Sequence, residues 1–168
     1  MKKLLIVRFV FLVIVSSMLF PTQIVRGQVN RVDVASWITD YRDVISGDSW
    51  DNPEGIIFWR GITQDVYYTA TDDRIQGWCT LVMNRNIFSE FGYSAVGHGT
   101  WETYPDDYPN GYWVGTFTAS IDSENVMRVR MVGKGYGALD GLTYSGSLEG
   151  GMLSTTYGVI TELPTYKP

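Results

Sequence analysis

Glycine occupies alternate positions at the start of the stretch that runs from residue 133 to residue 150. Alternate residues of a β-strand share one face, so Gly133, Gly135 and Gly137 remove three successive side chains from one side of a strand. Such a strand can bend sharply, form the corner of a barrel or let another group approach its backbone closely. The spacing from Gly133 to Ala138 also fits a dinucleotide-binding loop, but further glycines interrupt the helix that such a loop requires. The stretch therefore predicts a curved sheet rather than a nucleotide site.

Short runs of β-forming residues fill the chain from Gly55 onward. They are rich in valine, isoleucine, threonine and aromatic residues, and clusters of typical turn residues separate them. The pattern predicts strands at 56–62, 64–70, 76–88, 93–104, 111–122, 126–136, 141–149 and 154–162. A sequential antiparallel sheet of this size is most stable when it closes and loses its exposed edges. We therefore predict an all-β fold, an eight-stranded antiparallel up-and-down β-barrel that occupies residues 55–168.

The segment that precedes these strands has helical spacing instead. Between Val32 and Gly47 its apolar residues recur three or four positions apart, at Val34, Trp37, Ile38, Tyr41, Val44 and Ile45. Gly47 is a typical helix stop, and residues 48–54, which include Pro53, are typical of a linker or turn. Residues 28–54 are thus predicted to form a short N-terminal helical arm and linker.

The first 27 residues have the pattern of a signal peptide. Lys2 and Lys3 precede an apolar stretch from Leu4 to Phe20, and the chain around Gly27 offers a cleavage site. The pattern predicts a secreted or extracytoplasmic protein with no stable membrane insertion after cleavage. The alternative is an uncleaved N-terminal membrane anchor, because about 17 apolar residues lie at the short end of the range that spans a bilayer.

The charge balance restricts the partners of this chain. It contains 13 basic and 18 acidic residues; loss of residues 1–27 would remove four basic residues and no acidic one, leaving nine against 18. The net charge would then change from −5 to −9. An acidic surface of this kind argues against nucleic acid or an anionic membrane as a partner.

The chain has one cysteine, Cys79, and one histidine, His98. A single cysteine forms no intramolecular disulfide, so stability has to come from packing. One residue of each type is too few for a zinc site, and the acidic stretch at 105–110 lacks the spacing of a calcium loop. The sequence therefore predicts no metal and no cofactor.

A frame of glycines and aromatic residues recurs at the turns and faces of the predicted strands. Its elements are Trp59-x-Gly61, Asp72–Gly77, Asn84-x-Asn86, Gly92, Gly97–Thr100, Gly111-x-Trp113-x-Gly115-x-Phe117 and Gly133-x-Gly135-x-Gly137-x-x-x-Gly141-Leu142. This frame, which covers residues 55–162, resembles the allene oxide cyclase-like barrel proteins, which are related in shape to dirigent and spirotetronate-cyclase barrels. The resemblance implies an eight-stranded antiparallel barrel whose mainly apolar cavity folds a flexible substrate for cyclisation. It does not identify a catalytic set, and a fold does not fix a function.

His98 and Glu102 are the candidate catalytic residues. They share one face of the predicted strand 93–104, and if that face lines a cavity they could act as an acid/base pair. In the opposite orientation Gly97, Gly99 and Trp101 face inward and His98 faces solvent. The sequence favours the second orientation, because an isolated histidine has no partner that defines a site.

Aromatic residues are the candidate ligand-binding residues. Lining a cavity, they would hold an apolar or planar ligand; the alternative is plain core packing. The candidates are Trp59, Trp78, Trp101, Tyr112, Trp113, Phe117 and Tyr144.

Three functions fit this sequence. The first is an exported β-barrel that binds a small hydrophobic molecule in its cavity. The second is an isomerase or cyclase of the allene oxide cyclase type, which works by holding a flexible substrate in a reactive shape. The third is a non-catalytic surface interaction protein with a filled interior, whose binding loops are chiefly at 104–111. A homo-oligomer is compatible with all three.

Overall fold

The computed structural model describes residues 29–88, 94–151 and 154–162. The predicted signal peptide and the predicted turn at 89–92 lie outside these ranges. Every strand pairs with its neighbours in antiparallel fashion, and the described residues contain no helix. The strands are β1 (Asn30–Ile45), β2 (Asp48–Asp51), β3 (Ile56–Ala70), β4 (Gly77–Phe88), β5 (Ala95–Pro105), β6 (Gly111–Ile121), β7 (Met127–Gly137), β8 (Leu142–Gly150) and β9 (Thr156–Glu162).

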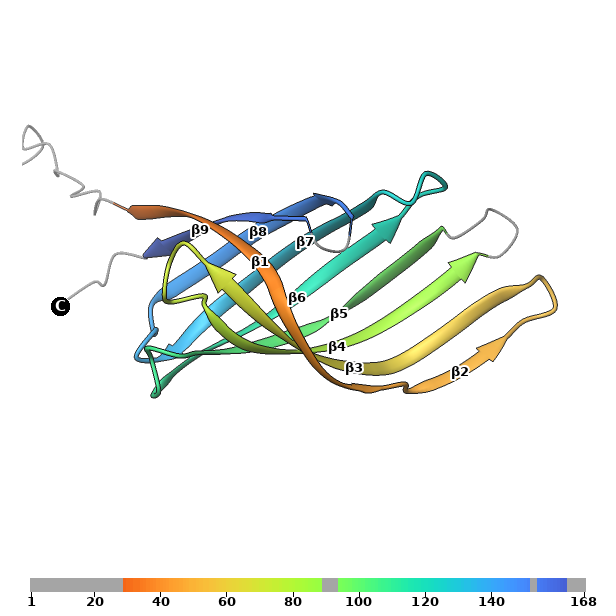
Figure 1. Cartoon of the computed structure of the whole chain (residues 1–168), viewed down its shortest axis with the longest axis horizontal. Coiled ribbons are helices and arrows are strands. Elements are labelled where there is room, and N and C mark those ends of the chain that lie inside the picture. Colours follow the sequence, from red (N-terminus) through yellow and green to blue (C-terminus); the bar gives the residue numbers. More distant parts are fainter. Residues whose placement is uncertain (1–28, 89–93, 152–153, 163–168) are drawn as a thin grey trace, which may run out of the picture.

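Hydrogen bonds close the sheet into a ring (Figure 1). From β3 to β9 each strand pairs with the next one along the chain, and β1 pairs with both β9 and β3. Of the nine strands, β2 pairs only with β3 and extends with it beyond the ring, so eight strands form the ring itself. Because β1 closes the ring, the boundary predicted at residue 55 runs through a single sheet.

The predicted strands agree with the observed ones except in β3. The two strands predicted at 56–62 and 64–70 are one continuous strand, Ile56–Ala70. A bulge between Trp59 and Ile62 shifts its register against β4, and Gly61 there has a φ of 70°, which glycine adopts without strain. Gly61 therefore marks a bulge within one continuous strand, close to the break predicted at residue 63.

The prediction of a helix between Val32 and Gly47 is wrong, because these residues form most of β1. Two register shifts, between Ile38 and Asp40 and between Arg42 and Val44, each leave one residue of β1 without an opposite partner. After each extra residue, the positions that would have faced inward face outward, and those that would have faced outward face inward. The inward residues Val34, Ser36, Ile38 and Tyr41 are consequently two or three positions apart, which partly resembles the period of a helix. The short β2, from Asp48, likewise replaces part of the predicted linker.

Aromatic side chains lie flat on the inner wall of the ring, where glycines leave room for them. A Cβ atom added to Gly133 would lie 2.7 Å from the Cη2 atom of Trp101, and one added to Gly99 would lie 2.7 Å from the Cζ atom of Phe117. The Tyr144 ring covers Gly158 in the same way. Within the 133–150 stretch, Gly133 and Gly146 thus make room for rings, whereas Gly135 lies against Leu139.

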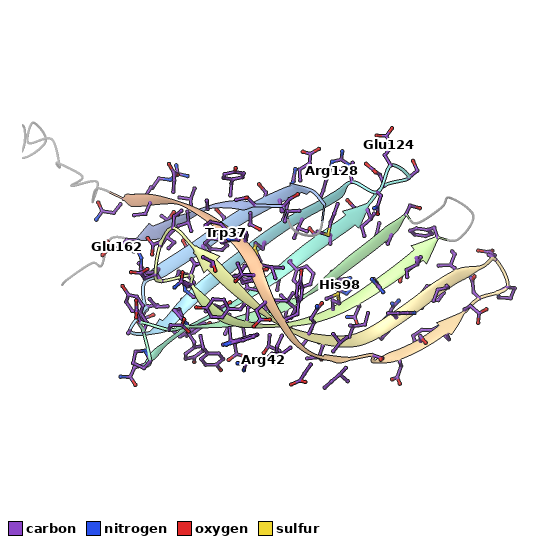
Figure 2. All side chains as sticks on the ribbon, viewed as in Figure 1. Trp37, Arg42, His98, Glu124, Arg128 and Glu162 are labelled. Atoms are coloured by element: carbon purple, nitrogen blue, oxygen red, sulfur yellow. The ribbon has the colours of Figure 1, made fainter. Side chains whose placement is uncertain are left out.

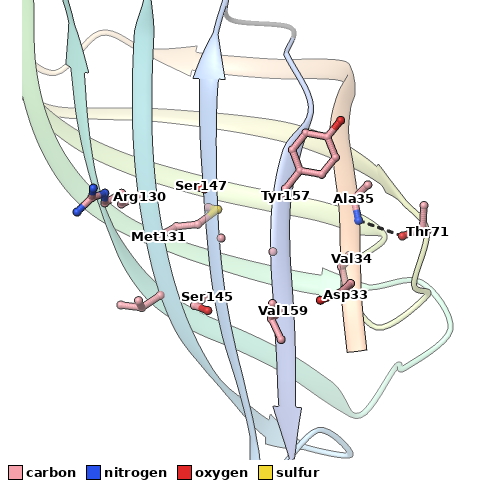
Figure 3. A pocket seen from close by; sticks show the side chains of 13 residues that line it. Asp33, Val34, Ala35, Thr71, Arg130, Met131, Ser145, Ser147, Tyr157 and Val159 are labelled. Carbon is pink, nitrogen blue, oxygen red and sulfur yellow. Dashed lines mark hydrogen bonds between the residues drawn. The ribbon is translucent and has the colours of Figure 1, made fainter. Parts of the chain in front are cut away.

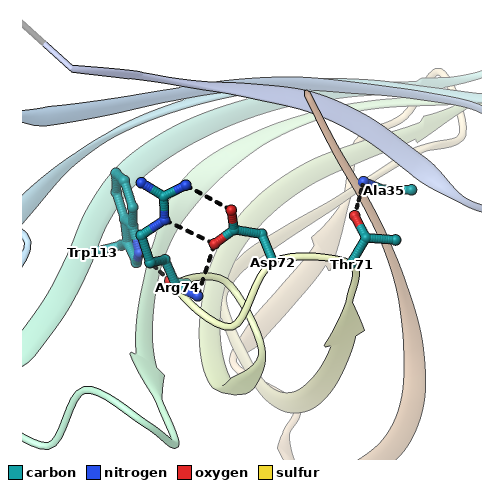
Figure 4. A network of polar contacts seen from close by, with 5 residues as sticks. All are labelled: Ala35, Thr71, Asp72, Arg74 and Trp113. Carbon is teal, nitrogen blue, oxygen red and sulfur yellow. Dashed lines mark hydrogen bonds and ion pairs between the residues drawn. The ribbon is translucent and has the colours of Figure 1, made fainter. Parts of the chain in front are cut away.

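One end of the ring is closed by the β3–β4 loop (Figure 4). Asp72 and Arg74 form an ion pair at 2.6 Å, and the carbonyl of Arg74 accepts a 2.6 Å hydrogen bond from the indole N–H of Trp113. Thr71 accepts a 3.0 Å hydrogen bond from the Ala35 N–H of β1, and Ile75 is buried in the core. These contacts hold the loop over this end of the ring and attach it to two strands, β1 and β6.

Candidate functional site

The other half of the interior contains a cavity of about 170 Å³. Its walls come from β1, β3, β4, β5, β6, β7, β8 and β9, and their side chains are mostly apolar. They include Leu81, Met83, Phe117, Val129 and Met131. The cavity is bounded on one side by the packed aromatic core and leads on the other toward the ends of β4 and β6. Its size is close to that of an engineered apolar cavity of about 150 Å³ that accepts benzene.

Arg85 of β4 lies where this cavity meets a second, open hollow. The hollow is lined by Arg85, Ile87, Ala95, Ile121 and Asn125, and three of these residues also line the inner cavity. Arg85 faces inward, because a Cβ atom added to the inward-facing Gly97 would lie 3.3 Å from the Arg85 Cβ. Its guanidinium carbon is 4.3 Å from the centre of the Trp59 ring. The cavity is thus a mainly apolar chamber with one cation at its opening.

Five of the seven predicted ligand-binding aromatics lie on the inner side of the ring. Phe117 lines the cavity, and the Trp59 ring contacts the guanidinium of Arg85 at the opening of the cavity. Trp101, Trp113 and Tyr144 are buried at the closed end, where Tyr144 packs edge-on against both tryptophans. These three residues form the floor of the chamber rather than its walls.

The remaining two predicted aromatics, Trp78 and Tyr112, lie on the outer face. Tyr112 stacks between Tyr104 and Tyr136 at ring distances of 5.8 and 5.3 Å, and Trp78 packs edge-on against Tyr67. Arg42, which Figure 2 labels, covers the Trp78 ring at 3.6 Å. The three stacked tyrosine rings stabilise cross-strand pairing on the outer face, away from the cavity.

His98 and Glu102 lie on the outer face of β5, whereas Trp101 and Thr103 are buried inside (Figure 2 labels His98). This is the orientation that the sequence favoured. Residues four positions apart on a strand are separated by about 13 Å, so the two side chains do not form a pair. Glu102 instead accepts a hydrogen bond from the hydroxyl of Tyr104. The acid/base pair that the cyclase hypothesis needs inside the cavity is therefore not formed by these residues.

Arg85 is not among the residues predicted from the sequence, although the alternation along β4 contained a signal. Cys79, Leu81 and Met83 occupy alternate positions of β4 and face inward, and the next residue in this series is Arg85. A charge that continues an apolar face is unusual, because charged side chains are rarely buried without a partner. Extending the pattern by one step would have identified the residue.

Cys79 is fully buried within the described structure and unsuited to nucleophilic chemistry. Burial raises the pKa of its thiol from 9.0 to about 12, and a hydrogen bond with Thr103 opposes that rise. The thiol therefore remains protonated at neutral pH, and it contributes to packing alone.

This burial predicts a loss of stability at alkaline pH. The unfolded chain releases the thiol proton near pH 9, whereas the folded chain holds it to about pH 12. The free energy of unfolding should therefore fall as the pH rises above 9, by up to about 1.4 kcal/mol per pH unit from this group. Urea unfolding at pH 8, 9 and 10 measures the effect, and Cys79→Ala should show a smaller fall. Equal falls in both proteins would contradict the assignment to Cys79.

The outer wall carries a shallow hollow over β1, β7, β8 and β9 (Figure 3). At its base lie Gly146 and Gly158, which have no side chains, and the Tyr144 ring packs against both glycines from the inner side of the sheet. Tyr157 and Arg130 are exposed at its rim. The hollow follows from the glycines that make room for the Tyr144 ring, and Met131 lines both this hollow and the inner cavity.

Within the described ranges, no helix is long and apolar enough to cross a membrane. The same residues contain no group of three histidine, cysteine, aspartate or glutamate side chains that could hold a metal ion. No protein-family model matches the sequence, and no curated protein is significantly similar to it.

Proposed function

We propose that this chain is an eight-stranded β-barrel that binds a small hydrophobic molecule in its interior. The observation that carries the proposal is the cavity of about 170 Å³, which apolar side chains of the ring enclose next to a tightly packed aromatic floor. A closed sheet of eight strands has an interior that is either filled by side chains or holds one small ligand. In this protein, side chains around Trp113 fill one half of the interior, and the other half contains the cavity.

The predicted resemblance to allene oxide cyclase-like barrels agrees with this architecture. Export after cleavage near Gly27 remains a prediction from the sequence. His98 and Glu102, the two residues proposed for cyclase chemistry, lie on the outer face of the ring and do not line the cavity. The interaction-protein hypothesis requires a filled interior, which the cavity disfavours. Binding without turnover is therefore the function that the geometry supports best.

Methionine methyl groups provide a direct test of binding. Three of the six methionines, Met83, Met127 and Met131, line the cavity. Toluene, a neutral molecule of the right size, should shift the resonances of these three methyl groups in protein labelled at methionine. Ala119 also lines the cavity, so Ala119→Phe should fill the space and abolish the shifts.

Thr118→Phe is the matched control, because Thr118 is the exposed neighbour of Ala119 on the outer face of β6. It adds the same ring to the same strand and should leave the toluene shifts intact. The proposal fails if toluene shifts none of the three methyl groups. It also fails if Ala119→Phe, still folded, responds to toluene as the unmodified protein does.

A further inference from the structure

Arg85 is the one charged residue among the described residues that line the cavity. A guanidinium carries five N–H donors, and a buried one normally pairs with a carboxylate. In the described ranges, the ion pairs of the chain involve Arg74 and Arg128, and no carboxylate lies within ion-pair distance of Arg85. The chain is acidic overall, with a net charge of −5, so the lack of a partner does not reflect a shortage of carboxylates.

The Nε atom of Arg85 is buried and has no hydrogen-bond partner among the described residues. Burial also lowers the pKa of the guanidinium, which shows that its surroundings disfavour the charge. The Trp59 ring stabilises one face of the cation, but a ring accepts no in-plane N–H donors. An unmade hydrogen bond at the buried Nε atom of this partly buried cation costs free energy that an anionic ligand would recover.

We propose that Arg85 binds the head group of the ligand, and that the ligand is a small monocarboxylate with an apolar body. This inference rests on the proposed function, since it takes the cavity to be the ligand site. A planar guanidinium matches a carboxylate with two parallel N–H···O bonds. The body of the ligand extends from Arg85 toward Met131 and Phe117, which lie deeper in the cavity.

The volume limits that body to about the size of one benzene ring or a chain of similar bulk. A long acyl chain does not fit inside 170 Å³, and a second charged group would meet apolar side chains such as Leu81 and Val129. The ligand class is therefore a single carboxylate on a compact aromatic or short aliphatic body.

The test compares benzoate with benzamide, which has nearly the same shape and no charge. Calorimetric titration of the purified protein should show that benzoate binds at least about tenfold more tightly than benzamide. Acetate, which has the head group without the body, should bind far more weakly than benzoate. Benzoate should shift the same methionine methyl groups that toluene shifts.

Two substitutions connect this preference to Arg85. Arg85→Met keeps an unbranched apolar side chain and removes the guanidinium, so the ratio of benzoate to benzamide affinity should fall to about one while benzamide binds as before. Arg85→Lys keeps a cation but loses the planar pair of donors, so it should retain only part of the ratio. Arg130→Met removes an exposed arginine from the outer wall and should change neither affinity.

The outcomes separate the two proposals. If toluene and benzamide bind but benzoate shows no preference over benzamide, the head-group role of Arg85 is wrong and the cavity remains a ligand site. If benzoate keeps its preference in Arg85→Met, another group binds the carboxylate and the inference also fails. If none of the three aromatic probes binds the unmodified protein, the proposed function itself is wrong. The comparison of probes in the unmodified protein does not depend on whether any variant folds.

Discussion

Trp113→Ala is expected to lower the free energy of unfolding by about 3–5 kcal/mol. The indole is completely buried at the closed end of the ring, where it packs against Tyr144. Its N–H also donates the 2.6 Å hydrogen bond to the carbonyl of Arg74, which anchors the β3–β4 loop. The substitution would leave a cavity and an unpaired carbonyl in the same place. Urea unfolding monitored by far-UV circular dichroism measures the loss.

Tyr112→Ala is the matched control, because Tyr112 precedes Trp113 on the same strand and faces outward between Tyr104 and Tyr136. Its loss should cost only about 0.5–1.5 kcal/mol, the usual value of a partly exposed ring contact. Trp113→Phe keeps an aromatic ring and removes the donor, so it should fall between the two. Equal costs for Trp113→Ala and Tyr112→Ala would contradict the assignment of the two faces.

Gly133→Ala is expected to destabilise the protein by about 2–3 kcal/mol, although alanine is a small residue. A Cβ atom at this position would overlap the six-membered ring of Trp101. That indole cannot easily move aside, because its N–H contacts the carbonyls of Thr116 and Val132 at 3.3 and 3.2 Å. Thermal unfolding followed by near-UV circular dichroism would show both the loss of stability and any change in the Trp101 environment.

Gly151→Ala provides the control, since a Cβ atom there would have no heavy atom within 4 Å. It should be neutral or slightly stabilising, because alanine restricts the unfolded chain. Trp101→Leu provides the complementary test: in that background Gly133→Ala should cost less than in the unmodified protein, because the overlapping ring is gone. Equal costs in the two backgrounds would show that Trp101 is not the obstacle.

The candidate site was predictable only in part, and the reason is the strand geometry. Alternation along β5 correctly placed Trp101 and His98 on opposite faces, because β5 pairs with β4 and β6 without a register shift. The same reasoning failed in β1, where extra residues at two bulges exchange the faces and imitate a helix. No local pattern reveals a bulge unless the partner strand is known.

The sequence by itself determined that this chain forms an antiparallel sheet and where most of its strands begin and end, because turn clusters and β-forming runs are local signals. It also predicted that the alternate glycines from Gly133 clear space on one face. Only the tertiary structure decided that β1 closes the ring, that the Trp101 ring fills the space at Gly133, and that Arg85 faces a cavity with no carboxylate partner among the described residues. Those properties depend on which strands meet across the ring, and contacts between residues far apart in the chain are not encoded in any single segment.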